Sequence, residues 1–288
     1  DDIRRRVGEC TDQRIFAVYE AIYRGCMTHE EIYNVCKIDW WFLDKFQNIA
    51  NNEHFLEDVK NGKAELTLEK YKALKEGGFP DKLIQDISGV EITGALGSLK
   101  DAEKAKSLVK EGKLAHIPTS YKLVSTCTGR FESDSPYFYS AYNCENESAN
   151  YLSTLKNRSS KGTIVVLGSG PIRIGQGIEF DYASVQCVWN LKKLGYEVAI
   201  INNNPETVST DFDTADRLYF EPLTPEDVMG VINTEKPIGV VVAFGGQTAI
   251  KLTKFLDSQG IQILGTSANS IDLAEDRERF EELCEKLN

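Results

Sequence analysis

Two glycine-rich stretches contain the residues best suited to chemistry. The first, TIVVLGSGPIRIGQGIEFDY, runs from 163 to 182, and the second, FGGQT, runs from 244 to 248. Glycines occur in the first stretch at Gly168, Gly170, Gly175 and Gly177. Such glycines let a backbone bend sharply or approach a ligand closely. Arg173, in the same loop, offers a fork of donors to a carboxylate or phosphate. These residues predict a site for a small anionic molecule.

The second stretch ends an apolar run and begins a helical one. Free amides of Gly245, Gly246 and Gln247, with the hydroxyl of Thr248, would then point at whatever lies beyond the strand, a geometry suited to an anion. A second interpretation stays open, in which the glycines allow tight packing of strand against helix.

Charged neighbours in the first loop also have two interpretations. Arg173 could bind an anion, or it could pair with Glu179 or Asp181 and hold the loop. The two carboxylates lie too close in sequence to be assigned as an acid and a base, so we expect them at a helix start, where negative charge is favourable.

A strand, a glycine turn and a helix in succession open a βαβ unit. A dinucleotide fingerprint would need a third glycine where Arg173 stands and an acidic residue after the second strand. The second strand instead leads into Asn202, Asn203 and Asn204. We therefore exclude NAD as a cofactor.

Residues 162–288 alternate between strand and helix patterns. Strands are predicted at 163–167, 197–201, 238–243 and 261–264, with 217–220 as an edge element. This alternation predicts a parallel, Rossmann-like α/β domain with helices on both faces. Ligands of such sheets bind at the carboxyl ends of the strands, where both glycine-rich stretches begin.

Residues 1–143 favour helices, and the polar segment 144–161 is typical of a linker. Thr28 and Glu31 have the spacing of a capping box. The expected fold class is therefore mixed, an all-α domain followed by a parallel α/β domain. Aromatic clusters could form an oligomer interface, but a core position is the commoner role of such side chains. They comprise Trp40, Trp41, Phe42, Tyr137, Phe138 and Tyr139.

Composition describes an ordinary soluble chain. The net charge of −11 argues against nucleic acid or an anionic membrane as main partner. Seven scattered cysteines without paired spacing favour reduced thiols and a cytoplasmic location. Cys26, His29 and Cys36 lack a further ligand pair, so no metal site is predicted.

Longer motifs resemble the large subunit of carbamoyl phosphate synthetase. The resemblance rests on LGSGPIRIGQGIEFDY (167–182), NNNPETVSTDFDTADRLYFEP (202–222), FGGQT (244–248) and GTSANSIDLAEDRERF (265–280). The wording is similar to the second of that subunit's two homologous halves. Upstream, RIFAVYEAIYRG (14–25), KIDWWFLDKF (37–46) and SYKLVSTCTGRFESDSPYFYSAY (120–142) resemble the helical oligomerisation domain that joins the halves.

The resemblance implies that 1–143 is an oligomerisation domain and 162–288 a pre-ATP-grasp domain that stops before its ATP-grasp partner. The parent enzyme would make carbamoyl phosphate from bicarbonate, ammonia released from glutamine and two ATP. Mg-ATP would bind mostly outside this segment, so no catalytic residue is assigned here. Substrate-wall or tunnel positions are Gly168, Gly170, Arg173, Gly175, Gln176, Gly177, Glu179, Gly245, Gly246, Gln247 and Thr248.

The implied partners are the other synthetase domains, a glutaminase subunit or domain, and further copies of the chain through 1–143. A urea-cycle type of parent would be mitochondrial. Arginine, pyrimidine and urea synthesis are not separated by these residues. Two alternatives remain, a helical partner-binding module fused to an autonomous nucleotide-binding domain, and another ATP-grasp carboxylate ligase.

Overall fold

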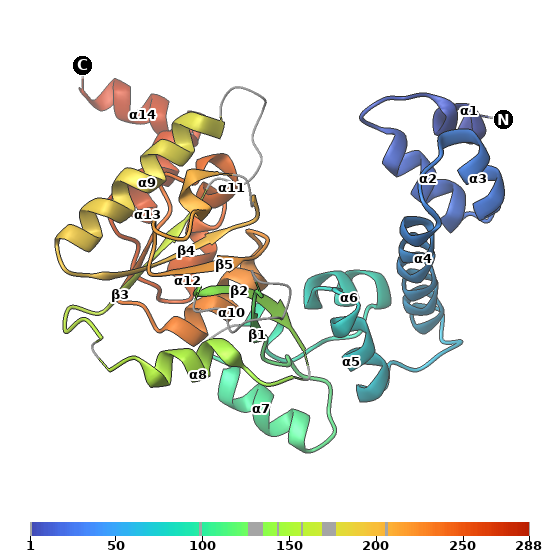
Figure 1. Ribbon diagram of the computed structural model, residues 1–288, viewed down its shortest axis with the longest axis horizontal. Helices are drawn as coiled ribbons and strands as arrows, with labels where there is room; N and C mark the ends of the chain where they lie inside the picture. Colours follow the sequence, from blue (N-terminus) through green and yellow to red (C-terminus); the bar gives the residue numbers. More distant parts are fainter. Residues whose placement is uncertain are drawn as a thin grey trace. The chain divides into compact units, whose positions relative to one another are not determined.

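The protein consists of two compact units, residues 1–92 and 93–288 (Figure 1). A computed structural model describes residues 2–97, 100–125, 135–142, 144–156, 158–168, 177–204 and 207–287, with the side chains of 177 and 178 left aside. Each unit is described by itself below.

Helices build the whole described part of the first unit. They are α1 (Asp2–Gly8), α2 (Arg14–Tyr23), α3 (His29–Cys36), α4 (Trp40–Lys60), α5 (Leu68–Glu76) and α6 (Asp81–Ser88). The predicted capping box is present, because Thr28 Oγ1 accepts from the Glu31 amide at 3.2 Å and Glu31 accepts from the Thr28 amide at 2.8 Å. The helical character expected for this region is confirmed.

A small apolar core holds the first four helices together. Its members lie on one side of each helix and include Val7, Val18, Ile22, Ile32 and Leu43. The periodic apolar positions of α2 enter this core through Ala17, Val18, Ala21 and Ile22.

The second unit begins with η1 (Ala95–Gly97) and α7 (Ala102–Lys110) and is dominated by a six-stranded sheet. The strands are β1 (Ser120–Leu123), β2 (Tyr137–Ala141), β3 (Thr163–Leu167), β4 (Glu197–Asn202), β5 (Arg217–Phe220) and β6 (Gly239–Val241). Their order is β1-β2-β5-β4-β3-β6, and every neighbouring pair is parallel except the antiparallel β1–β2 pair. The predicted parallel α/β fold is confirmed.

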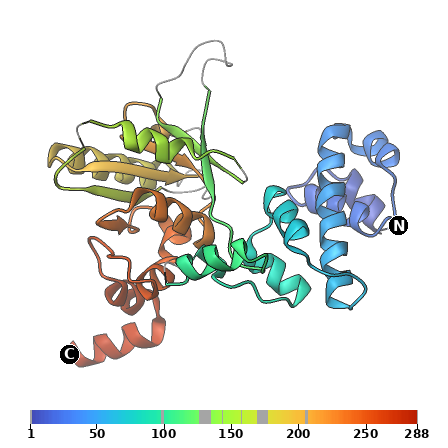
Figure 2. The same cartoon turned by 90° about the horizontal axis from the view of Figure 1, so that it is seen from below.

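Successive residues of each central strand enter opposite cores (Figure 2). Val165, Leu167 and Tyr219 pack on one face with α10 (Pro225–Glu235) and α12 (Thr253–Ser258). Val166 and Leu218 pack on the other face with α9 (Gly177–Lys193). Because both faces are covered, the strands read as continuous apolar runs in the sequence.

The remaining helices connect or flank the sheet. They are α8 (Glu147–Thr154), η2 (Val208–Thr210), α11 (Gly246–Ile250), α13 (Ala268–Glu275) and α14 (Arg277–Leu287). Thr224 caps α10 by accepting from the Asp227 amide at 3.2 Å, with Pro225 in the first turn, as predicted. Within the described ranges, no helix is long and apolar enough to cross a membrane.

Three features differ from the sequence expectation. The segment 217–220 is not an edge strand, because β5 lies between β2 and β4. Its outer neighbour β2 comes from the region expected to be purely helical, so the compact second unit starts at Thr93 rather than near residue 144. The expected linker contains α8, whose cap is the Asn146 side chain. The segment 261–264 forms an isolated bridge from Ile263 to Val240 instead of a named strand.

Candidate functional site

Strand order marks one position at the carboxyl edge of the sheet. From β3 the chain adds β4 and then β5 on one side, whereas β6 lies on the opposite side of β3. Open α/β sheets bind ligands where the winding direction reverses in this way. The loops that leave β3 and β6 are the two glycine-rich stretches, so the topology brings both stretches to this reversal point.

Close backbone contact joins these two loops. An ideal Cβ on Gly245 would lie 2.8 Å from the Leu167 carbonyl oxygen, 3.0 Å from the Gly168 carbonyl oxygen and 2.3 Å from Ala249 Cβ. Gly246 has a φ of +63°, in the left-handed region that favours glycine. The packing interpretation of these glycines therefore has a direct geometric basis.

Gln247 and Thr248 are exposed at the start of α11. This helix has five residues, so its N-terminus is too short to act as an anion site by itself. Gln247 Nε2 donates to Glu275 at 3.4 Å, and both residues line a cavity of about 380 Å³. Lys251, Lys254 and Asp272 give that cavity charges of both signs. The anion-binding role of 245–248 stays a prediction.

Asn202 ties the end of β4 to both neighbouring loops. Its side chain is fully buried, and an added Cβ on Gly168 would lie 2.8 Å from Asn202 Nδ2. Nδ2 donates to Ser209 Oγ at 3.1 Å, and Oδ1 accepts from the Asn204 amide at 3.1 Å. The predicted loop-ordering role of the asparagines is thus confirmed for Asn202.

Asp181 lies near the start of α9, as expected, but its side chain is buried and directed to η2. Its two carboxylate oxygens accept from the Ser209 amide at 3.3 and 3.4 Å. Ser184 Oγ, one turn later, donates to the Phe244 carbonyl oxygen at 3.4 Å. Helix α9 therefore holds the loops that follow β4 and β6.

Several predicted site residues fall elsewhere or outside the described part. Glu179 is exposed in the first turn of α9, and α9 begins at Gly177. Gly170, Arg173, Gly175 and Gln176 lie outside the described residues, so the pairing proposed for Arg173 is not addressed.

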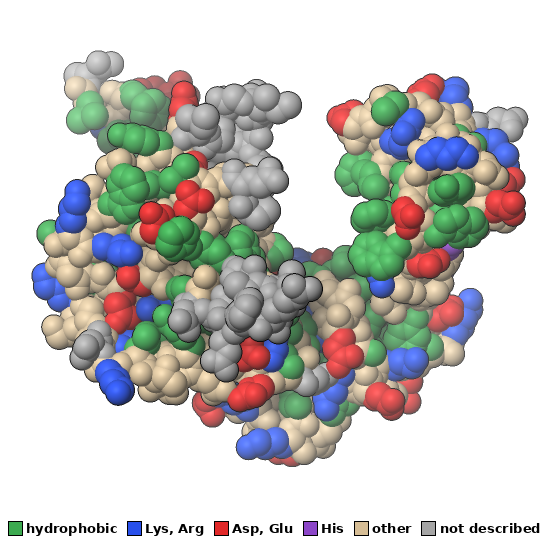
Figure 3. All heavy atoms as spheres, in the orientation of Figure 1, with side chains coloured by type: hydrophobic (Ala, Val, Ile, Leu, Met, Phe, Trp, Pro, Cys, Tyr) green, Lys and Arg blue, Asp and Glu red, His purple; other side chains and the backbone are tan. Residues whose placement is uncertain are grey.

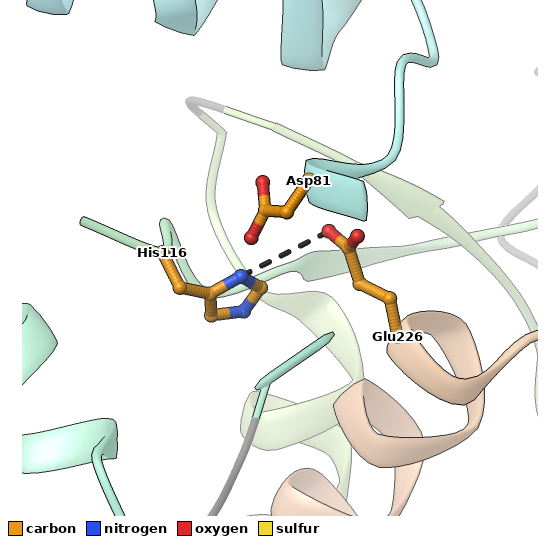
Figure 4. A group of neighbouring side chains, drawn as sticks. All are labelled: Asp81, His116 and Glu226. Atoms are coloured by element: carbon orange, nitrogen blue, oxygen red, sulfur yellow. Dashed lines mark ion pairs between the residues drawn. The ribbon is translucent and has the colours of Figure 1, made fainter. Parts of the chain in front are cut away.

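Histidine and cysteine positions offer separate contacts. Cys26 and Cys36 each donate to a carbonyl of the preceding turn, and His29 Nδ1 lies 3.4 Å from Asp44 Oδ1. In the second unit, His116 Nδ1 lies 3.8 Å from Glu226 Oε1, and both side chains are buried (Figure 4). Asp81, also drawn there, belongs to the first unit, where it pairs with Lys75 at 3.0 Å.

A buried charge cluster at the amino edge of the sheet was missed by sequence reasoning. Arg217 binds Glu235 through two hydrogen bonds of 2.8 and 3.0 Å and Glu197 through one of 2.9 Å. Tyr219 donates to Glu235 at 2.7 Å. Burial would lower the pKa of the Arg217 guanidinium, but the two carboxylates raise it overall. The cluster lies at the strand ends opposite the glycine loops.

A second missed group, Glu221, directly follows β5 at the carboxyl edge. Its side chain is 1% exposed, and its Oε1 has no hydrogen-bond partner among the described residues. Burial, opposed in part by hydrogen bonds from Ser140 and reinforced by Asp227, raises the pKa of the Glu221 carboxyl to about 8. A single glutamate after a strand gives no sequence signal of such an environment.

The contact between the two loops can be tested by Gly245→Ala. The added methyl group has no room against Leu167 and Ala249, so we expect a loss of about 1–3 kcal/mol in the stability of the second unit. Urea unfolding measures this loss. Gly8→Ala is the matched control, because its Cβ would meet Val35 at an ordinary 3.5 Å. Equal stabilities of the two variants would show that the loop gives way without cost.

Comparison with known proteins follows the division seen in the fold. Residues 1–100 match a family model described as the carbamoyl-phosphate synthetase large chain oligomerisation domain. Residues 160–273 match one described as the carbamoyl phosphate synthase preATP-grasp domain.

One relative is similar over almost the whole chain. It is a carbamoyl phosphate synthase large chain of Lachnoclostridium phytofermentans, 48% identical over 286 residues. The alignment covers 99% of this chain and 24% of the relative, so the chain spans about a quarter of that protein's length. A solved biotin carboxylase subunit of pyruvate carboxylase is 20% identical, with a TM-score of 0.32, over 43% of this chain and 27% of that one. A likeness at that level supports no inference about fold or function.

Proposed function

The chain belongs to the family of carbamoyl phosphate synthase large chains, and we propose that it supplies two domains to an ATP-dependent ligase that makes carbamoyl phosphate. The observation that carries this proposal is 48% identity through both units in one continuous alignment. The substrates of that ligase would be bicarbonate, ammonia from glutamine and two ATP. The alternatives of an autonomous nucleotide-binding module and of another ATP-grasp ligase are not favoured by this alignment.

In this proposal the second unit forms one wall of the site where carbamate is phosphorylated. The reversal of winding beside β3 supports that location, because both glycine-rich loops leave the sheet there. Gly168 and Gly245 keep the two loops in contact, and Asn202 fixes the third loop beside them. Gln247 and Thr248 are exposed and could contact substrate. The further wall or tunnel residues are Gly170, Arg173, Gly175, Gln176, Gly177, Glu179 and Gly246.

The ligands of Mg-ATP would come mostly from a neighbouring ATP-grasp domain of the parent enzyme. The residues of the second unit that are described above place amides, amide side chains and hydroxyls at the wall, groups that orient a small anion. They do not include a cluster of carboxylates and lysines around one phosphate-sized space. We therefore propose that the chain alone is catalytically incomplete.

The first unit would supply contacts for assembly. Its match to an oligomerisation domain supports this role, and the other synthetase domains and a glutaminase subunit would complete the enzyme. We propose a cytoplasmic location for the assembled enzyme, or a mitochondrial one if it serves urea synthesis.

Catalytic incompleteness can be tested on the chain as it stands. Incubated with bicarbonate, ammonia and Mg-ATP, the chain should produce no carbamoyl phosphate above the level without protein. Calorimetric titration with Mg-ATP should give no binding at micromolar concentrations. The autonomous nucleotide-binding alternative requires tight binding in the same titration. Turnover in the first assay would overturn the proposal that the active site needs other domains.

A further inference from the structure

An apolar face on the first unit is left without a partner in its own fold. Five large hydrophobic side chains, 37–63% exposed, define what we call the α2–α4 face: Ile15, Phe16, Trp41, Phe42 and Ile49. Figure 3 shows hydrophobic side chains gathered over α2 and the first turns of α4. Scattered single residues of this kind are common on surfaces, but a contiguous group is typical of an interaction site.

The packing of α2 on α4 makes the group contiguous. Tyr19 contacts Phe46 and donates to Glu53 at 2.6 Å, and Tyr23 contacts His54 and donates to Glu57. Later residues of α2 thus meet later residues of α4, so the two helices run parallel. Phe16 precedes Tyr19 by one turn and Phe42 precedes Phe46 by one turn, and both extend the same seam.

Two further contacts complete the face. Ile49 lies seven residues after Phe42, which puts both on one side of α4. Trp41 packs edge-on against Phe42, with ring centroids 5.0 Å apart. The Lys45 ammonium lies 4.9 Å from the Trp41 ring centroid and forms a charged border. An aromatic centre with a charged border is the usual composition of a protein interface.

The unit does not need this face for its own core. Ala17 and Val18, the next residues along α2, are buried, as are Leu43 and Ala50 on α4. The five side chains of the face are therefore surplus to the fold of the unit, and their exposure to water is unfavourable.

We propose that the α2–α4 face binds the same face on a second copy of this chain across a two-fold axis. A second copy is the occupant we infer because the face lies wholly within the residues that match an oligomerisation domain. A two-fold contact uses one self-complementary patch twice, which a single apolar face with a charged border can provide. The inference rests on the proposed assembly role of the first unit and identifies the surface that performs it.

Solution mass measures the association directly. Light scattering on the intact chain across a concentration series, from about 1 to several hundred micromolar, should show a monomer–dimer equilibrium. Trp41→Ser and Phe42→Ser should each weaken dimerisation at least about tenfold, because truncating a central aromatic usually costs that much or more. Phe212→Ser is the matched control, since Phe212 is 72% exposed on the second unit, and it should leave the equilibrium unchanged.

A fluorescence measurement separates loss of contact from loss of fold. In a chain carrying Trp40→Phe and Trp189→Phe, Trp41 is the single tryptophan. Its emission should shift to the blue and become protected from acrylamide as the concentration rises. Circular dichroism of the serine variants should match the parent chain, because the replaced side chains are largely exposed.

The possible failures point to different errors. A chain that dimerises equally with and without Trp41 and Phe42 would overturn the assignment of the face but keep the assembly role of the first unit. A chain that is monomeric throughout, with Trp41 emission independent of concentration, would overturn the inference. Absence of catalysis by the isolated chain would still stand as a separate result.

Discussion

Arg217→Leu is expected to destabilise the second unit by about 3–5 kcal/mol, the usual cost of removing one partner of a buried ion pair. The Arg217 side chain is 2% exposed and serves Glu235 and Glu197 together. Leucine would leave Glu235 buried with Tyr219 as a donor but without a positive charge. Urea unfolding followed by Trp189 fluorescence, with Trp40 and Trp41 changed to phenylalanine, reports on the second unit alone.

Two further variants identify the cause of that loss. Arg158 also binds Glu197, at 3.3 Å, but is 40% exposed, so Arg158→Leu should cost less than about 1 kcal/mol. Combining Arg217→Leu with Glu235→Leu should recover part of the stability, because an apolar pair of similar size often replaces a buried ion pair well. If Arg217→Leu costs no more than Arg158→Leu, the cluster does not stabilise the sheet.

The sequence could not predict this cluster, and the reason lies in the sheet. Arg217 and Glu235 are 18 positions apart, and the strand pairing of β4 with β5 brings Glu197 close. The segment 217–220 was expected at an edge, where an arginine would face water. That expectation followed from assigning 120–142 to the helical domain, which left no strand to cover the outer side of β5.

Local patterns with a physical requirement were predicted well. The continuous apolar run 163–167 is β3, buried on both faces, and the Thr28–Glu31 spacing is a capping box. Gly168 and Gly245 were expected where backbones approach closely, and the structure has both in such contacts. The sequence left packing and ligand binding open as explanations, because a close approach to protein and one to a ligand demand the same residue.

Burial of the aromatic residues depends on the partner of each face and not on residue type. A core position was expected for Trp41 and Phe42, and both are more than half exposed. Phe138 and Tyr139 are neighbours in β2, yet Phe138 is fully buried and Tyr139 is 44% exposed, since adjacent strand residues point to opposite faces. Composition alone does not distinguish these cases.

Glu221→Gln is expected to stabilise the second unit at alkaline pH and to have little effect near pH 6. The carboxyl keeps its proton up to about pH 8 in the folded chain, against an ordinary pKa of 4.5 when unfolded. Between these values the folded state binds more protons than the unfolded state, so the free energy of unfolding falls as pH rises. That loss has a slope of up to about 1.4 kcal/mol per pH unit and is complete above the folded pKa.

The environment of Glu221 explains why no neighbour offsets the charge. Ser140 on β2 donates hydrogen bonds, whereas Asp227 on α10 adds like charge and the buried Tyr121 hydroxyl on β1 stays neutral. Glutamine keeps the shape and an acceptor for Ser140 but cannot ionise. Unfolding measured by Trp189 fluorescence from pH 6 to 9.5 should show the fall for the parent chain and a flat profile for Glu221→Gln. Glu103→Gln, with its side chain 88% exposed, should follow the parent profile. Parallel profiles for all three chains would mean that Glu221 is already ionised in the folded state at neutral pH.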